Sequence, residues 1–416
     1  MAQVHSRKDS TESTGTLGSD QSAESVSSTF STASKASEIY KNPKGDIERL
    51  QDTIKEQDLG RYISKCEHLI SCLSNSDENE IKFSGSKLEL DRVMKGMLEH
   101  AVGIEGKKYV LAAILSCESK AEGETDHERL PDLVNNLKAV AETWAYYLLF
   151  IFKAGPGSRK TQSKMLKDDV KRRDGYQCVI TGWLDVENLY DRNGLATDLE
   201  VAHILRRATA TFTKDVSGSA ASTFDILRNF TGLPAALIEN LKDHADHVAN
   251  CITLLSPAHY EWDKYGFCLK PTEEDHVYKI HYFTDLAQDA IEGLRQGTAG
   301  ELVRFSDRSD EFLPYKCQRT DEEDGARPST RSGSGSQSSS KFELPSKTFI
   351  AIHAAVAGVL NMSGAGKFFD ELLSKYDEDD EKNPPVRCWD DLEKKARDYH
   401  LSEQVQRIMI GDATPA

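Results

Sequence analysis

Apolar side chains recur at helical spacing along the chain that follows residue 43. One series begins at Ile47, a second begins at Leu88, and a third covers residues 133–152. A spacing of three to four residues places apolar side chains on one face of a helix. Pro131 precedes the third series and suits the first turn of its helix. We therefore expect a helical domain over residues 44–154.

Aromatic side chains are concentrated in the third series, at Trp144, Tyr146, Tyr147 and Phe150. They allow two interpretations, a docking surface or a buried core. An aromatic stripe at helical spacing is more often core, because large apolar side chains are usually buried. We expect these residues to lie inside the helical domain.

The middle of the chain changes to a strand-like pattern. Residues 172–182 suit a short strand or the entry to a hairpin, and 199–205 form a strand-like stretch with His203 near its end. Pro257 suits a helix start, so that His259 would lie on the first helical turn. The predicted order of strand, strand and helix gives an α+β fold class within a mostly helical chain.

Low-complexity sequence separates these periodic segments. Residues 1–43 are rich in Ser and Thr, and 318–346 combine an acidic run with a Ser/Gly-rich run. Such segments bury too little apolar surface to offset the entropy of ordering, so we expect a disordered tail and a linker. Apolar periodicity returns over 347–416, which predicts a small helical C-terminal region.

Composition restricts the class of protein. The formal net charge is −16, which argues against a protein that coats DNA but leaves room for a local basic patch. The eight cysteines include no CxxC pair, so no zinc ribbon is expected. The apolar runs are shorter than the roughly 20 residues of a membrane span, and the N-terminus resembles no secretory signal. We expect an intracellular protein that does not enter a membrane, in the nucleus or the cytoplasm.

The densest basic segment runs from Arg159 to Arg173 and includes Lys171 and Arg172. A run of this kind is usually a solvated helix face. Because it leads directly into the segment that carries the candidate chemistry, contact with nucleic-acid phosphates is an equally good interpretation. We select Lys171, Arg172 and Arg173 as candidate nucleic-acid contacts.

Candidate chemistry lies in His203, Asn250 and His259. Hydrolysis of a phosphodiester bond needs a base that activates water and a cation that stabilises the departing oxygen. A neutral histidine accepts a proton near physiological pH, an asparagine fixes neighbouring groups through its amide, and a second histidine can bind a divalent metal.

The order of motifs resembles the HNH endonucleases of the ββα-metal class. These motifs are Arg173-Asp-Gly-x-x-Cys178-x-x-Thr-Gly182, then Ala202-His203-Ile, then Asn250, then His259-x-x-Trp262-Asp263-x-x-Gly266. The resemblance is to the subgroup without a zinc knuckle and covers roughly residues 165–290. It implies a two-stranded antiparallel hairpin and a helix around one divalent metal, Mg²⁺ or Mn²⁺, within a nuclease-like domain at 159–290.

The resemblance also implies roles for individual residues. His203 corresponds to the general base, Asn250 to the residue that orients the base-bearing loop, and His259 to the metal ligand. Asp263 corresponds to an acidic position that is structural or a metal ligand. Structural roles are expected for Cys178, Thr181, Gly182 and Trp262.

The sequence departs from the family pattern at Ala202, where many HNH enzymes carry a metal-binding carboxylate. Glu200 is two residues earlier and shares a strand face with Ala202, so it is a candidate replacement ligand if the strand bends.

Residues 206–248 separate His203 from Asn250 and predict an inserted helical cap that could contact substrate. Within it, His244 and His247 lie one helical turn apart. They suggest either a second metal site or a polar helix face, of which the polar face is favoured.

Two functions follow from these observations. The first is a metal-dependent endonuclease that cuts nucleic acid, with DNA as the expected substrate. The alternative is a weakly active or inactive HNH-derived binding or regulatory module that acts through its helical domains. The set of His203, Asn250 and His259 with the adjacent basic run favours the first, whereas the net charge and Ala202 favour the second. Protein partners remain open.

Overall fold

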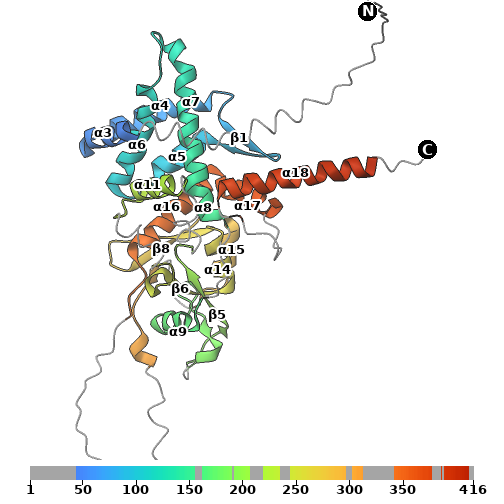
Figure 1. Ribbon diagram of the computed structural model, residues 1–416. Coiled ribbons are helices and arrows are strands. Elements are labelled where there is room, and N and C mark those ends of the chain that lie inside the picture. Colours follow the sequence, from blue (N-terminus) through green and yellow to red (C-terminus); the bar gives the residue numbers. More distant parts are fainter. Residues whose placement is uncertain are drawn as a thin grey trace, which may run out of the picture.

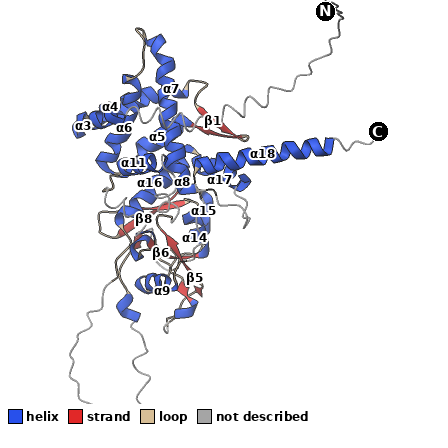
Figure 2. Cartoon of the chain, in the orientation of Figure 1, coloured by secondary structure: helices blue, strands red, loops and turns tan. Residues whose placement is uncertain are grey.

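The fold is α+β, as the sequence predicts, with many helices and four small sheets among the described residues. The computed structural model describes residues 44–154, 162–189, 192–206, 219–234, 244–296, 302–312, 342–376, 386 and 388–411. The predicted disordered tail at 1–43 and the part of the predicted linker at 318–341 lie outside these ranges. Helices occupy the upper half of Figure 1, and most of the strands lie in its lower half (Figures 1 and 2).

The N-terminal half forms a helical body. Its elements are α3 (Lys44–Thr53), η1 (Glu56–Asp58), α4 (Leu59–Ser74), the hairpin β1 (Glu80–Phe83) and β2 (Ser86–Glu89), α5 (Leu90–His100), α6 (Gly103–Ser119), α7 (Asp126–Trp144), the π-helix η2 (Ala145–Leu149) and α8 (Phe150–Lys153). Helix α6 is buried along most of its length and packs against α3, α4 and α7.

Helix α7 begins earlier than the apolar pattern indicates. Thr125 caps it and pairs reciprocally with Glu128 in a capping box, so the helix starts at Asp126 and Pro131 lies inside it. The expectation that Pro131 would lie in the first turn is therefore wrong. The capping box satisfies the free N–H groups of a helix start and sets the boundary.

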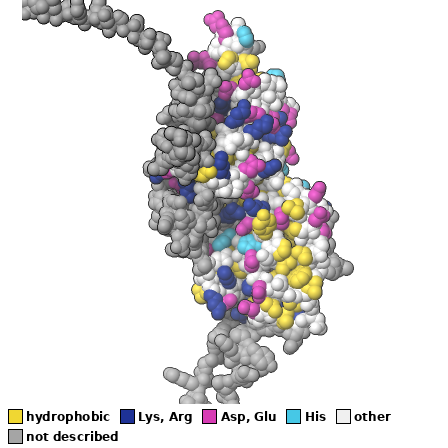
Figure 3. All heavy atoms as spheres, turned by 90° about the vertical axis from the view of Figure 1, so that its right-hand side faces the viewer, with side chains coloured by type: hydrophobic (Ala, Val, Ile, Leu, Met, Phe, Trp, Pro, Cys, Tyr) yellow, Lys and Arg dark blue, Asp and Glu magenta, His cyan; other side chains and the backbone are white. Residues whose placement is uncertain are grey.

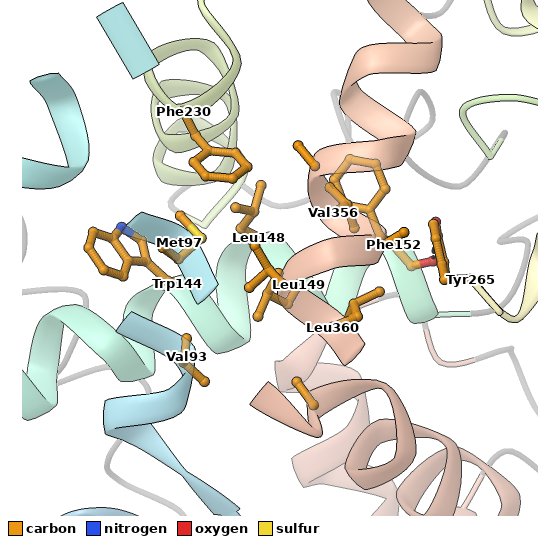
Figure 4. Packing of buried hydrophobic residues seen from close by; sticks show 14 of the residues in the cluster. Val93, Met97, Trp144, Leu148, Leu149, Phe152, Phe230, Tyr265, Val356 and Leu360 are labelled. Atoms are coloured by element: carbon orange, nitrogen blue, oxygen red, sulfur yellow. Dashed lines mark hydrogen bonds between the residues drawn. The ribbon is translucent and has the colours of Figure 1, made fainter. Parts of the chain in front are cut away.

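The aromatic stripe of the sequence is core. Trp144, Tyr146, Tyr147 and Phe150 are all buried, and Figure 4 shows Trp144, Leu148 and Leu149 among side chains from other helices. Tyr146 stacks on Trp389, with ring centroids 4.2 Å apart. This confirms the core interpretation.

The middle of the chain contributes two layers. The first contains α9 (Lys164–Arg173), β3 (Leu184–Asp185), η3 (Val186–Asn188), β4 (Ala196–Thr197), β5 (Leu199–His203), η4 (Val248–Asn250), β6 (Cys251–Leu255) and α14 (Ser256–Asp263). The second contains β7 (Phe267–Pro271), β8 (Val277–Tyr282), α15 (Asp285–Glu292), β9 (Leu302–Arg304) and η5 (Ser309–Phe312), with β7, β8 and β9 in one antiparallel sheet.

The insertion after β5 joins the helical body. Its helix α11 (Ser219–Thr231) buries Ile226, Leu227 and Phe230 and packs against α6 and η2. Gly106 permits this approach, because a Cβ atom there would lie 2.3 Å from the Phe230 carbonyl oxygen. The described part of the insertion, which follows β5, therefore packs against the N-terminal helical body. Residues 207–218 and 235–243 of the predicted helical cap lie outside the described residues.

The C-terminal helices are α16 (Lys347–Ser363), α17 (Ala365–Tyr376) and α18 (Trp389–Gly411). Helix α16 packs against α5 of the helical body and also against β7, and Figure 1 shows it between the two halves. One hydrophobic cluster includes Ile47, Leu254 and Val356, so a continuous core links the helical body, the strands and α16.

Among the described helices, none is both long and apolar enough to cross a bilayer alone. The bent pair α16 and α17 passes the same test of length and composition when taken together.

Candidate active site

The frame of the site consists of β5, β6 and α14. Strands β5 and β6 are antiparallel, with His203 opposite Cys251 and Leu199 opposite Leu255. Every residue of β6 is buried, as expected of a short and nearly continuous apolar run. Helix α14 follows β6 directly, and Pro257 lies in its first turn, where its missing N–H costs no helical hydrogen bond.

His203 lies at the end of β5 with its ring held from two sides. Its Nε2 is 3.1 Å from Asp246 Oδ1, and its Nδ1 is 3.1 Å from Gln162 Nε2. The His203 side chain is 16% exposed, so the ring is partly shielded from water but still accessible. The Gln162 Nε2 atom is also 3.4 Å from His203 Nε2, so the amide lies close to both ring nitrogens, and the two side chains together fix the position of the imidazole.

Asn250 is buried and binds the loop that follows His203. Its Oδ1 accepts a hydrogen bond from Leu205 N at 2.9 Å, and its Nδ2 donates to the carbonyl oxygens of Leu205 and Ala245 at 3.0 Å. Leu205 is two residues after His203, and Ala245 precedes Asp246. The Asn250 amide therefore joins the two segments that supply the His203–Asp246 pair.

His259 lies on α14 between two carboxylates. Its Nδ1 is 2.5 Å from Glu200 Oε2, and its Nε2 is 3.7 Å from Asp263 Oδ2. Glu200 thus reaches the imidazole from β5, whereas Ala202 is buried in the core. Among the residues that the structure describes, no group of three or more His, Cys, Asp or Glu side chains has the geometry of a metal site.

Trp262 couples the helix to the strand. Its buried indole N–H donates to the His203 carbonyl oxygen at 3.0 Å. On its other side it stacks on His353 of α16, with centroids 3.6 Å apart and rings 4° from parallel. His353, from the C-terminal region, therefore packs against the tryptophan that contacts the backbone of His203.

Burial lowers the pKa of His353 to about 3 from an ordinary value of 6.5. The unfolded chain therefore takes up a proton below pH 6.5 while the folded protein does not, and stability falls as the pH decreases. Between pH 7.5 and 5.0 we expect this group to remove about 2 kcal/mol, from 1.36 kcal/mol per pKa unit.

The His353→Phe variant tests this expectation because it retains a stacking ring that does not titrate. Its free energy of unfolding in denaturant should fall about 2 kcal/mol less than that of the wild type between the same two pH values. An equal fall in the two proteins would show that His353 is not held neutral.

The basic segment is largely engaged within the fold. Arg173 is 0% exposed and pairs with Asp174 through two hydrogen bonds of 2.8 and 3.0 Å. It also donates to the carbonyl oxygens of Val248 and Cys251, both at 2.8 Å. No atom of Arg173 faces a surface where a phosphate could bind, so its position is that of a structural residue.

The two preceding basic residues also make internal contacts. Lys171 lies 2.6 Å from the buried carboxylate of Asp185. Arg172 Nε donates to the carbonyl oxygen of Ser309 at a longer distance, 3.4 Å. Lys171 is mostly buried, whereas Arg172 is half-buried and is the more accessible of the two.

The turn between α9 and β3 contains the other motif residues. Cys178 and Thr181 are buried, and Thr181 N donates to Cys178 Sγ. Gly182 has φ +81°, which glycine adopts without strain, and its N–H donates to the Cys178 carbonyl oxygen. All seven cysteines in the described residues are free thiols.

His244 and His247 contact each other edge to face, with ring centroids 5.9 Å apart. His247 Nδ1 accepts a hydrogen bond from Ala249 N at 3.3 Å. Asp243, the first residue of that acidic and histidine-rich run, lies outside the described residues.

Sequence reasoning missed three residues of this arrangement. Asp246 belongs to a run that was interpreted as a polar face, and Gln162 precedes α9 without any motif. His353 is 91 residues away from Trp262, so no local pattern could have indicated their contact. Only the aspartate offered a signal, because an acidic residue in the insertion before Asn250 can reach the end of β5.

The comparison with protein families matches residues 178–270 to the HNH endonuclease model. This confirms the family that the motif order resembles and supports a nuclease-type function for the segment. The match covers β5, β6 and α14 but excludes Gln162 and His353. Comparisons with curated proteins and with solved structures gave no match.

Proposed function

We propose that this chain is a metal-dependent endonuclease that hydrolyses phosphodiester bonds in DNA, with His203 as the general base. The observation that carries the proposal is the His203 ring, held between Asp246 and Gln162 at the end of β5 in a segment that matches the HNH family. A positioned imidazole of this kind serves to remove a proton from an attacking water.

The tautomer follows from the two partners of the ring. A carboxylate accepts only, so Nε2 carries the proton and donates to Asp246. Nδ1 then has the lone pair, and the Gln162 amide donates to it. A water that displaces the amide would present its proton to Nδ1, and Asp246 would stabilise the imidazolium that forms.

The donor set around His259 fits a divalent metal. A histidine that binds a metal usually donates its other ring N–H to a carboxylate, and Glu200 is the acceptor beside Nδ1. Nε2 and the Asp263 carboxylate would then hold the metal. Glu200 thereby becomes an orienting residue in place of a ligand. So few protein ligands suit Mg²⁺ or Mn²⁺, which keep several waters and bind substrate phosphates.

When bound, the metal would neutralise charge on the scissile phosphate and on the departing oxygen. The protein residues supply the remaining functions. His203 takes the proton, Asp246 orients the base, and Trp262 fixes the backbone at His203 relative to α14.

Metal dependence tests the proposal. The full chain should cleave end-labelled DNA oligonucleotides with Mg²⁺ or Mn²⁺ and should stop when a chelator is added. In His259→Ala the metal concentration that gives half the maximal rate should rise at least about tenfold, the scale found for weaker perturbations of a metal site. Glu200→Gln should raise it by a similar or smaller factor.

His68→Ala provides the control, because His68 is exposed on α4 and belongs to the helical body. It should retain the metal requirement of the wild type. Cleavage that persists in chelator, or a His259→Ala variant with an unchanged requirement, would refute the assignment of the metal site.

The alternative of an inactive binding or regulatory module has one specific observation in its favour. Ala202 is fully buried, so the position that carries a carboxylate in many HNH enzymes contributes no ligand. Our proposal differs from this alternative in assigning Asp263 as the acidic ligand.

A further inference from the structure

Basic and aromatic side chains lie on both sides of the candidate site. We propose that a single strand of nucleic acid crosses the site from the first turn of α9 to the end of α14. Lys164 and Lys167 would contact its phosphates, and an unstacked base would lie on Tyr260. This inference rests on the proposed function and names its substrate class.

The first turn of α9 lies beside the general base. Gln162 precedes the helix, and its amide contacts both the His203 ring and the Val201 carbonyl oxygen at 3.1 Å. Ser163 caps the helix by accepting a hydrogen bond from Leu166 N. These contacts fix the start of α9 against the end of β5, so the next residues of the helix border the candidate site.

Lys164 and Lys167 are three residues apart, and side chains at this spacing are neighbours on a helix surface. Both are exposed, whereas Leu166 and Val170 of the same helix are buried in the cluster that includes Val201 and Cys251. Within the described chain, neither lysine forms an ion pair, although Asp168 and Asp169 follow them. They are therefore available to a phosphate, unlike Lys171 and Arg173.

Tyr260 is exposed on α14, the helix that carries His259. It is next to His259 in sequence and is 62% exposed, which is high for an aromatic side chain. Lys264 is 44% exposed, with its Nζ 6.0 Å from the Tyr260 ring centroid and 3.6 Å from Asp370 Oδ1. Figure 3 shows one face of the molecule, with histidine side chains near its middle and both basic and acidic side chains close to them.

The exposed lysines and the exposed tyrosine favour a single strand of nucleic acid as the ligand of this surface. Cations that follow a phosphate backbone and an exposed ring that stacks on bases are the two features of proteins that bind single strands. A duplex hides the faces of its bases, so Tyr260 would gain little from intact double-stranded DNA. Because the net charge of −16 repels nucleic acid, a localised basic site is needed to attract the strand to this part of the surface.

Binding is measured without cleavage by placing the substitutions in the full-length His203→Ala variant. The probe is a fluorescent single-stranded oligonucleotide of mixed sequence, and anisotropy gives its Kd over a series of salt concentrations. Lys164→Ala with Lys167→Ala should reduce the slope of log K against log salt by about 1.4, from about 0.7 per phosphate contact. Lys55→Ala with Lys394→Ala, two exposed lysines elsewhere on the chain, should leave the slope unchanged.

The aromatic contact is tested separately. Tyr260→Ala should weaken binding of the single strand about tenfold, while Tyr260→Phe should remain within about twofold because the ring is kept. The matched duplex should show a smaller effect of Tyr260→Ala. Since all these side chains are exposed, the melting temperature of each variant should match that of its parent.

The outcomes separate this inference from the proposed function. If the wild type cleaves DNA while the lysine and tyrosine variants bind the single strand as tightly as their His203→Ala parent, the surface is refuted and the nuclease stands. If the variants lose binding as described while the wild type cleaves nothing, the surface stands and the nuclease assignment fails. An equal loss of duplex and single-strand binding in Tyr260→Ala would overturn the preference for single strands.

Discussion

The His203→Ala variant is expected to cleave DNA about 10²–10⁴ times more slowly than the wild type, the usual contribution of a general base. Its loss leaves Asp246 and Gln162 without the ring that joins them and removes the imidazole that would accept a proton from water. The measurement is the initial rate with saturating metal, for proteins purified in parallel.

The loss should not arise from unfolding. The His203 side chain is partly accessible at the end of β5, and the contact from Trp262 is made to its backbone carbonyl, which alanine retains. The melting temperature should therefore change little. Asp246→Asn, which keeps the size of the side chain but removes its charge, should give an intermediate rate. Full activity in His203→Ala would show that another group is the base.

Replacement of Arg173 by leucine should destabilise the protein by about 3–5 kcal/mol, the cost of breaking a buried ion pair from one side. The variant leaves the Asp174 carboxylate buried with fewer partners and removes the side-chain donor from the carbonyl oxygens of Val248 and Cys251. Because Asp174 Oδ2 also accepts from Thr253 N, the damage should extend into β6.

Arg172→Ala is the matched control, because Arg172 is the neighbouring residue on α9 and makes one long hydrogen bond. It should change the free energy of unfolding by about 0.5 kcal/mol or less, as surface substitutions do. Denaturant unfolding of the wild type, Arg173→Leu and Arg172→Ala distinguishes a structural role of Arg173 from a phosphate-contact role. A stable Arg173→Leu variant with a weaker salt dependence of DNA binding would favour the phosphate-contact role and contradict our structural assignment.

The elements that carry the candidate site could be predicted from the sequence because their signals are local. The apolar stretch ending at His203 and the proline at 257 predict β5 and the start of α14 as observed. The buried run 251–255 is strand β6, paired with β5 across an insertion that leaves its register unchanged. Spacing and residue type were sufficient here, since each element is defined within a few positions.

The remaining features depend on contacts between distant segments. A run of lysine and arginine has the same pattern on a solvated face and beside a buried carboxylate, so the burial of Arg173 could not be inferred. Asp246 gains its role only because Asn250 holds the preceding Ala245 against the end of β5. His353 reaches Trp262 only because α16 packs between the helical body and β7.

Ala202 illustrates a further limit. The missing carboxylate was visible in the sequence, and Glu200 was a candidate to replace it only if the strand bends. The structure brings Glu200 to His259 Nδ1, the ring nitrogen that a metal ligand uses for an orienting contact. The sequence identified the residue, but its role depends on which nitrogen it approaches.

Cleavage of labelled DNA, tested as a single strand and as a duplex, in Mg²⁺ by the wild type, alongside the His203→Ala/His259→Ala double variant prepared in the same way, tests the central claim most directly. The account predicts internal cleavage by the wild type that ends on addition of chelator, and no cleavage above background by the double variant. Equal cleavage by both proteins, or none by a folded wild type in either Mg²⁺ or Mn²⁺, would contradict it.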